Sequence, residues 1–168
     1  MRRLYTRRVP ARPGLDLAIG FARREDALAI AEMSRDLIES GLGWSWTRDR
    51  VLRSLRHRET NAIVARPDAD LGQPAAFAIM RYGETEAHLL LLAVRPSFGR
   101  RGVGTALVGW LEDCARVAGL EQVVLETRST NGAARAFYRG LGYAPSSVVP
   151  GYYGGKETSV RMVKCLSR

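Results

Sequence analysis

The sequence has 168 residues, of which 46% are hydrophobic and 26% are charged, and this balance is typical of one globular domain. It contains no run of about 18 apolar residues and no apolar segment behind the charged N-terminus, so it predicts neither a transmembrane helix nor a secretory signal. Two cysteines, Cys114 and Cys165, are too few for a disulfide framework. We expect both to be reduced, as in a cytoplasmic protein.

The positive charge is concentrated at the start of the chain. Removing the five arginines of the first 14 residues from the net charge of +9 leaves +4 for the rest; they are Arg2, Arg3, Arg7, Arg8 and Arg12. We expect residues 1–14 to form a basic, flexible arm and residues 15–168 to form the domain. The Arg-rich, acid-free start also resembles an organellar transit peptide. Because the body is only mildly basic, nucleic acid is not the expected partner.

The first half of the domain alternates helical and strand patterns. We expect a strand at 15–21, a helix from residue 25, a second helix after 47, a strand at 61–65, and a hairpin of strands 75–81 and 86–94. Thr47 is the expected N-cap of the second helix. The apolar run 89–94 predicts a strand buried on both faces. The loop 41–46 contains Trp44, which either lines an acceptor site or covers the core.

The second half predicts a crossover between parallel strands. A helix at 104–118 ends at Gly119, a strand follows at 123–127, and a helix runs from Asn131 to Gly142. Late strands are expected near Val148 and at 159–165. The residues between the strands at 86–94 and 123–127 suit a right-handed strand-helix-strand unit.

The segment from Val94 to Leu107 turns from a buried strand through glycines into a helix. Glycines allow close approach of a ligand to the backbone, and a helix N-terminus attracts anions, so a pyrophosphate fits there. A plain turn with solvated arginines is the alternative. The segment lacks the Gly-Lys-Ser/Thr of a Walker A loop, and Leu107 stands where a dinucleotide fingerprint needs a small residue.

Two motifs together resemble the GNAT superfamily of N-acetyltransferases. V-x-P-x-x-x-x-x-G-V-G-x-x-L, from Val94, is similar to its acetyl-CoA pyrophosphate loop, and residues 131–143 match its N-x-x-A-x-x-F/L-Y-x-x-x-G-F/Y element. One position departs from the pattern, because Gly99 stands where the family usually has glutamine or arginine. Arg100 and Arg101 remain available for charge-assisted contacts.

The resemblance implies an α/β fold consisting of a single GNAT-type domain. Its central sheet is mixed and mostly antiparallel, with helices on both faces and a strand-helix-strand crossover that binds acetyl-CoA as cosubstrate. No metal is implied. The implied cofactor-binding residues are Leu92, Ala93, Val94, Gly99, Arg100, Arg101, Gly102, Val103, Gly104, Thr105, Asn131, Ala134, Phe137 and Tyr138.

Acetyl transfer needs a neutral amine, and an alkylamine of ordinary pKa is about 10³-fold protonated at pH 7, so a base is useful. Glu126 lies in an apolar strand pattern, where it either serves a site or is a solvated or ion-paired carboxylate at a strand end. In the family branch that acetylates protein α-amino groups, L-E-V-R-x-S-N holds the base. The similar sequence from Leu125 makes Glu126 the first choice; the substitutes are Glu84, Glu86 and His88.

The motif gives Tyr138 the role of hydrogen-bonding the departing thiolate and returning a proton to it, although the position alone suits a core tyrosine. By the same resemblance the backbone N–H of Val94 stabilises the oxyanion. Asn131 either touches the pantetheine arm of the cofactor or caps its helix.

The expected acceptor is a primary amine, and a protein or peptide N-terminus is favoured. Tyr152 and Tyr153 resemble a segment that borders the peptide groove, although a hairpin loop with exposed tyrosines is equally compatible. The alternatives are a small-molecule amine acetyltransferase and, in another class, a non-catalytic acyl-CoA sensor. A homodimer is left open.

Overall fold

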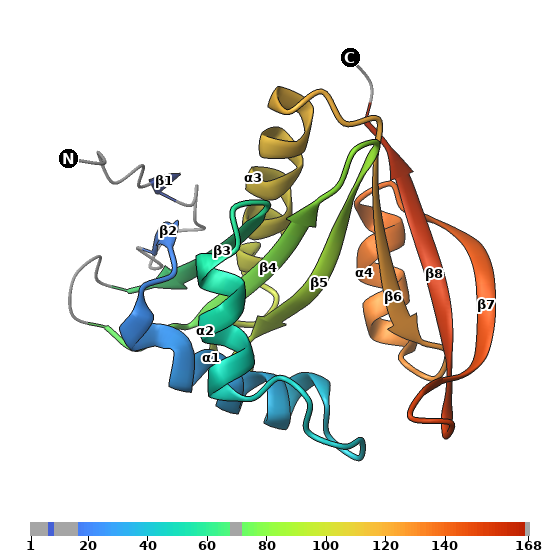
Figure 1. Ribbon diagram of the computed structural model, residues 1–168, viewed down its shortest axis with the longest axis horizontal. Helices are drawn as coiled ribbons and strands as arrows, with labels where there is room; N and C mark the ends of the chain where they lie inside the picture. The colour runs from blue at the N-terminus through green and yellow to red at the C-terminus, as the bar shows by residue number, and fades with distance from the viewer. Residues whose placement is uncertain (1–6, 9–16, 68–71, 167–168) are drawn as a thin grey trace. The chain divides into compact units, whose positions relative to one another are not determined.

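Strands and helices follow one another in the expected chain order (Figure 1). The computed structural model describes residues 7–8, 17–67 and 72–166. The strands are β1 Arg7–Arg8, β2 Ala18–Phe21, β3 Thr60–Arg66, β4 Ala76–Tyr82, β5 Glu86–Val94, β6 Gln122–Arg128, β7 Ala144–Tyr153 and β8 Glu157–Cys165. The helices are α1 Ala27–Met33, α2 Arg48–Arg56, α3 Val103–Val117 and α4 Gly132–Gly140, with short turns η1 Arg24–Asp26, η2 Ser34–Ile38 and η3 Pro96–Phe98.

The chain forms two compact units. The first contains residues up to Met80 together with Leu91–Leu111, and the second contains Arg81–Leu90 and the residues from Glu112 onward. Strands of the first unit lie in the order β1-β2-β3-β4-β5, and those of the second in the order β5-β6-β8-β7. β5 and β6 are parallel, whereas β6 with β8 and β8 with β7 are antiparallel. The expected mixed, mostly antiparallel sheet with a parallel crossover is confirmed.

The first unit buries its apolar side chains between α1, α2 and the strands. α2 packs against α1 and β3, and its predicted N-cap is confirmed because the Thr47 hydroxyl accepts from the Arg50 amide at 3.4 Å. The predicted helix from residue 25 is shorter than expected. α1 ends at Met33, and the chain continues as the π-helix η2. The spacing of apolar residues in the sequence did not predict this change.

The prediction that the run 89–94 is buried on both faces is wrong. Leu89, Leu91 and Ala93 are buried, but the side chains that alternate with them are half-buried. Because successive strand residues point to opposite faces, one face of β5 is partly open. A continuous apolar run hides this asymmetry, since both faces carry leucine.

In the second unit a buried carboxylate joins the end of α3 to β8. The carboxylate of Glu112, with the residue 4% exposed, accepts from the Tyr143 hydroxyl at 2.9 Å and from Lys164 Nζ at 2.6 Å. Burying a charge is tolerated when it is paired and hydrogen-bonded, and both conditions hold here. The network fixes the segment after α4 against β8.

Part of the basic arm is ordered as β1, in which Arg7 and Arg8 pair with Ile19 and Ala18. The rest of the expected arm, residues 1–6 and 9–14, lies outside the described residues. No helix in the described part of the chain is long and apolar enough to cross a membrane. Cys114 and Cys165 are free thiols.

A buried ion pair ties η1 to β3 in the first unit. Asp26 Oδ2 accepts from Arg66 Nη2 at 2.7 Å and from the Arg23 amide at 2.7 Å, and the side chains of Asp26 and Arg66 are 6% and 9% exposed. Removal of one partner leaves a sheltered charge without its counterion.

We expect Asp26→Asn to lower the free energy of unfolding by about 3 kcal/mol in urea titrations, because Arg66 then lacks a charged partner. Arg66→Met is expected to cost a similar amount, and the double variant less than the two single losses together. Single losses that add up in the double variant would show that the two residues are not coupled.

Candidate active site

The loop after β5 leads into the N-terminus of a helix. The chain leaves Val94, passes through η3 and enters the N-terminus of α3, whose first amides have no acceptor within their own helix. Arg95 anchors the start of the loop: its amide donates to the Ala75 carbonyl and its Nε to the Pro74 carbonyl, each at 2.8 Å. The loop is therefore held at its base while its tip faces solvent.

Two residues of this loop have left-handed backbones. Gly102 has φ +82°, and an added Cβ there would meet no atom within 4 Å, so the space beside its backbone is open. Arg100 has φ +56°, which costs a non-glycine residue about 1–2 kcal/mol. Arg100 and Arg101 are both exposed at the helix N-terminus. Open backbone, helix dipole and two guanidiniums fit a pyrophosphate.

The departure at Gly99 has a local structural reason. A Cβ added to Gly99 would lie 3.2 Å from the Pro96 carbonyl oxygen, so a larger residue requires the η3 turn to shift slightly. The sequence therefore departs from the motif at a position where the backbone is tight.

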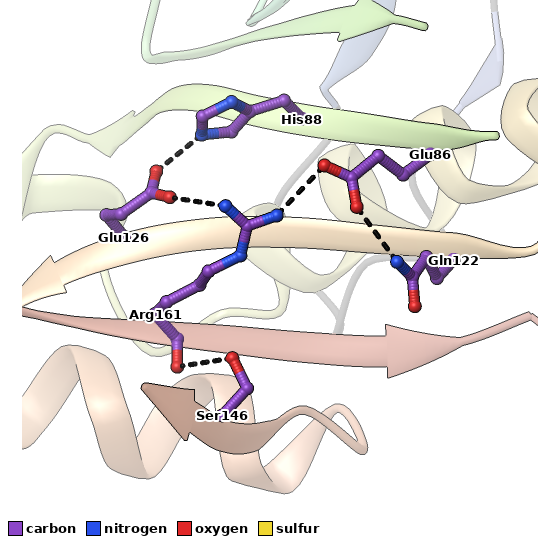
Figure 2. Close-up of polar contacts among 6 residues, drawn as sticks. All are labelled: Glu86, His88, Gln122, Glu126, Ser146 and Arg161. Atoms are coloured by element: carbon purple, nitrogen blue, oxygen red, sulfur yellow. Dashed lines mark hydrogen bonds and ion pairs between the residues drawn. The ribbon is translucent and has the colours of Figure 1, made fainter. Parts of the chain in front are cut away.

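In the second unit, five polar side chains from three adjacent strands point toward one another on one face of the sheet (Figure 2). His88 Nε2 lies 2.5 Å from Glu126 Oε2, and the other carboxylate oxygen of Glu126 lies 3.6 Å from Arg161 Nη1. Arg161 Nη2 donates to Glu86 Oε1 at 2.9 Å, and Gln122 Nε2 donates to Glu86 Oε2 at 2.8 Å. These contacts form one continuous network, hereafter the polar cluster, which consists of Glu86, His88, Gln122, Glu126 and Arg161.

Strand register explains why these residues meet. Glu126 on β6 stands directly opposite Arg161 on β8, and Glu86 on β5 stands beside Gln122 on β6. Residues two apart on a strand share a face, so His88 joins Glu86 on the β5 side. The side chains of Glu126 and His88 are only 11% and 24% exposed. This half-sheltered position strengthens each electrostatic contact relative to bulk water.

Tyr152 and Tyr153, at the end of β7, adjoin the polar cluster. Burial raises the pKa of the Tyr153 phenol to about 12, with further contributions from Tyr152 and Glu126. Burial, and then the Glu126 charge, also raise the pKa of Tyr152, which is 48% exposed. The two rings meet edge to face at 5.0 Å. They form the end of β7, directly before the turn to β8.

Tyr138 on α4 is buried in a stack of aromatic rings. Its ring centroid lies 5.1 Å from that of Phe137 and 5.6 Å from that of Tyr143. Burial raises the pKa of the Tyr138 phenol well above its ordinary value, and the neighbouring Tyr153 adds to the shift. The phenol is therefore neutral, and able to donate its hydrogen, throughout the physiological range.

Asn131 acts as the N-cap of α4. Its Oδ1 accepts from the Ala134 amide at 3.0 Å, so this one of the two predicted roles is confirmed. Asn131 is exposed, whereas Ala134 and Phe137 are half-buried.

The aromatic loop 41–46 belongs to the first unit. Its conformation depends on Glu39, a buried carboxylate that accepts from the Ser45 and Trp46 amides at 2.8 and 3.1 Å. Trp44 is 42% exposed, with the Arg35 guanidinium 5.5 Å from its ring centroid, while Trp46 is buried. The loop thus serves the core through Trp46 and leaves Trp44 accessible.

The structure separates the candidate bases. Glu126, His88 and Glu86 meet in the polar cluster, but Glu84 lies exposed in the hairpin turn. The sequence analysis missed Arg161 and Gln122, because only cross-strand register brings them to Glu126 and Glu86. Among the residues that the structure describes, no group of three His, Cys, Asp or Glu side chains is placed to hold a metal ion.

Comparison with known proteins identifies the family. The sequence model of the Acetyltransferase (GNAT) family matches residues 30–143. The [ribosomal protein bS18]-alanine N-acetyltransferase of Escherichia coli K12 is 36% identical over 99 residues, which are 57% of this chain and 67% of that protein. The chain therefore belongs to the GNAT family, and it is an acetyl-CoA-dependent N-acetyltransferase.

Solved structures agree with this assignment. The crystal structure of the ribosomal-protein-S18-alanine N-acetyltransferase from Escherichia coli matches with a TM-score of 0.73 and 26% identity, covering 90% of this chain and 95% of that one. Nourseothricin acetyltransferase matches with a TM-score of 0.61 and 25% identity, covering 66% of this chain and 67% of the other. The predicted fold class, family and enzyme class are confirmed.

The left-handed backbone of Arg100 allows its charge and its conformation to be tested separately. We expect Arg100→Gly to leave the free energy of unfolding unchanged or to raise it by up to about 1 kcal/mol, because relief of strain offsets the added freedom of the unfolded chain. Affinity for acetyl-CoA, measured by calorimetry, should fall about 10-fold with the loss of a charge-assisted contact.

Arg101→Gly is the matched control, since the φ of Arg101 is not left-handed. It should lose affinity in the same way but also lower the free energy of unfolding by about 0.5–1 kcal/mol. Unchanged affinity in both variants would remove the two arginines from the cofactor site.

Proposed function

We propose that the protein transfers the acetyl group of acetyl-CoA to the α-amino group of a protein or peptide. The observation that carries this proposal is the polar cluster, in which a sheltered carboxylate, Glu126, adjoins the tyrosine pair Tyr152 and Tyr153. An ammonium group is attracted to such a carboxylate, and aromatic rings beside it suit an extended peptide. The E. coli relative is named for acetylation of an alanine of ribosomal protein bS18, and this name supports the same acceptor class. A ribosomal acceptor would place the reaction in the cytoplasm.

The cofactor is proposed to lie on the loop of the first unit. The amides of Gly102 to Thr105 and the side chains of Arg100 and Arg101 would hold the pyrophosphate, and Leu92, Ala93 and Val94 of β5 would lie beside the pantetheine and thioester. When bound, acetyl-CoA supplies the activated acyl group. The Val94 amide is the proposed donor to the carbonyl oxygen as negative charge develops there.

The polar cluster is proposed to remove the first proton. Starting from the ammonium form, the acceptor nitrogen gives one proton to the cluster that contains Glu126 and then attacks the thioester carbonyl. A carbon–nitrogen bond forms, the carbon–sulfur bond breaks, and the second nitrogen proton ends on the sulfur. The cluster has one net negative charge when His88 is neutral, and this charge favours binding of a cationic acceptor.

Tyr138 is proposed to donate a hydrogen bond to the departing sulfur. Its raised pKa keeps the hydroxyl protonated, so a donor is present at every pH at which the enzyme works. The same shift makes complete transfer of this proton to a thiolate costly, because an ordinary thiol has a pKa near 8.5. Stabilisation of developing charge is therefore its main contribution.

A small-molecule amine is the second candidate acceptor. It is favoured by the structural match to nourseothricin acetyltransferase, whose name states a small-molecule substrate. The third candidate, a non-catalytic acyl-CoA sensor, would need neither Glu126 nor Tyr138.

Thiol release distinguishes the three candidates. Short peptides with free N-termini are expected to be turned over, and the same peptides with blocked N-termini are not, even when they contain lysine. Turnover of polyamines or aminoglycosides alone would favour the small-molecule function. Acetyl-CoA binding without turnover of any amine would favour the sensor.

Tyr138→Phe is expected to lower kcat about 10²-fold without changing acetyl-CoA affinity, because the ring keeps its packing and loses only the donor. Tyr143→Phe is a matched control on the same aromatic stack. It should lower stability through the lost hydrogen bond to Glu112 and leave kcat unchanged. Equal turnover of the Tyr138 variant and the native enzyme would exclude Tyr138 from the reaction.

A further inference from the structure

The polar cluster contains a second candidate proton acceptor besides Glu126, the imidazole of His88. Both carboxylate oxygens of Glu126 are engaged, one with His88 Nε2 at 2.5 Å and the other with Arg161 at 3.6 Å. Both oxygens of Glu86 are also engaged, with Arg161 and Gln122. Each carboxylate is thus already paired with a guanidinium or hydrogen-bonded, and such pairing favours its charged form and makes it a weaker proton acceptor.

The imidazole of His88 is differently placed. A carboxylate accepts hydrogen bonds, so Glu126 favours the tautomer in which Nε2 carries the hydrogen. The lone pair then lies on Nδ1, which points away from Glu126 (Figure 2). In the described part of the chain no residue is hydrogen-bonded to Nδ1. The ring is therefore held through its Nε2 contact to Glu126, while Nδ1 is available to accept a proton.

We propose that His88 Nδ1 takes the proton of the acceptor ammonium and that Glu126 is the positioning residue that orients the ring. This inference rests on the proposed acetyltransfer to an amine and assigns its proton-accepting atom. The ammonium nitrogen loses one proton, Nδ1 gains it, and the imidazolium so formed is stabilised by the Glu126 carboxylate at Nε2. The net charge of cluster plus acceptor is the same before and after this transfer.

The same assignment favours α-amino acceptors. An α-amino group has an ordinary pKa near 8 and an alkylamine such as lysine one near 10.4, so an α-amino group gives up its proton roughly 10²-fold more readily. Proton transfer to the ring is thus a smaller step for an N-terminus than for a lysine side chain. The charged and titratable groups around the ring are Glu126, Arg161, Glu86, Tyr152 and Tyr153, and the tyrosines remain neutral below about pH 10.

The tautomer is measurable without any acceptor. The chain has two histidines, His57 and His88, so the ring nitrogens of His88 are assigned in nitrogen-15 NMR spectra by comparison with His88→Gln. We expect the neutral ring to carry its hydrogen on Nε2 and to lose this preference in Glu126→Ala. A ring with its hydrogen on Nδ1, or a ring that stays cationic throughout the range of activity, would overturn the proposal.

Kinetics distinguish a base from a structural partner. His88→Gln keeps an N–H near the position of Nε2 and so keeps the contact to Glu126, but it has no basic nitrogen. We expect its kcat/KM for an N-terminal peptide to fall about 10²-fold near neutral pH and the loss to shrink as rising pH deprotonates the amine. Added imidazole should partly restore His88→Ala.

Each failure has its own signature. Near-native activity of His88→Gln, with Glu126→Gln inactive, would return the role of base to Glu126. Absence of turnover by the native enzyme on every peptide would contradict the proposed function instead, and the NMR result would still decide the tautomer.

Discussion

A carboxylate that is taken out of water must be paired, and this requirement organises the polar cluster of the second unit. Glu126 is sheltered on β6, so its charge needs a cation, which Arg161 supplies from the strand opposite. Arg161 in turn needs Glu86, and Glu86 is held by Gln122. Each partner contacts the next, and His88 meets a carboxylate that is also paired with Arg161. The precision of the site thus comes from sheet register rather than from any loop.

The aromatic residues play a complementary part, because they control which groups stay neutral. Burial raises the pKa values of Tyr138 and Tyr153, so both phenols stay neutral and Tyr153 adds no negative charge near Glu126. A face with two carboxylates, one guanidinium and neutral phenols keeps a small negative potential over a wide pH range. That condition suits both the proposed binding of a cationic acceptor and the proposed hydrogen bond from a neutral tyrosine hydroxyl.

The sequence predicted most of what is local. The loop around Gly102, the caps Thr47 and Asn131, and the strand that carries Glu126 follow from spacing and residue type within a few positions. Strand partners are set by distant packing, and for that reason Arg161 was missed and His88 was kept only as a substitute base. The π-helix η2 and the half-open face of β5 were also missed, since an apolar run of leucines has no visible alternation.

β7 has a consequence for how the protein behaves at high concentration. It is the terminal strand of the second unit, it is largely exposed, and its register with β8 shifts near Pro145 and again after Val149. Proline offers no amide to a neighbouring strand, and bulges twist a strand out of plane, so such an edge is a poor template for another chain. The exposed strand edge beside Tyr152 and Tyr153 therefore does not favour edge-to-edge aggregation with another copy of the protein.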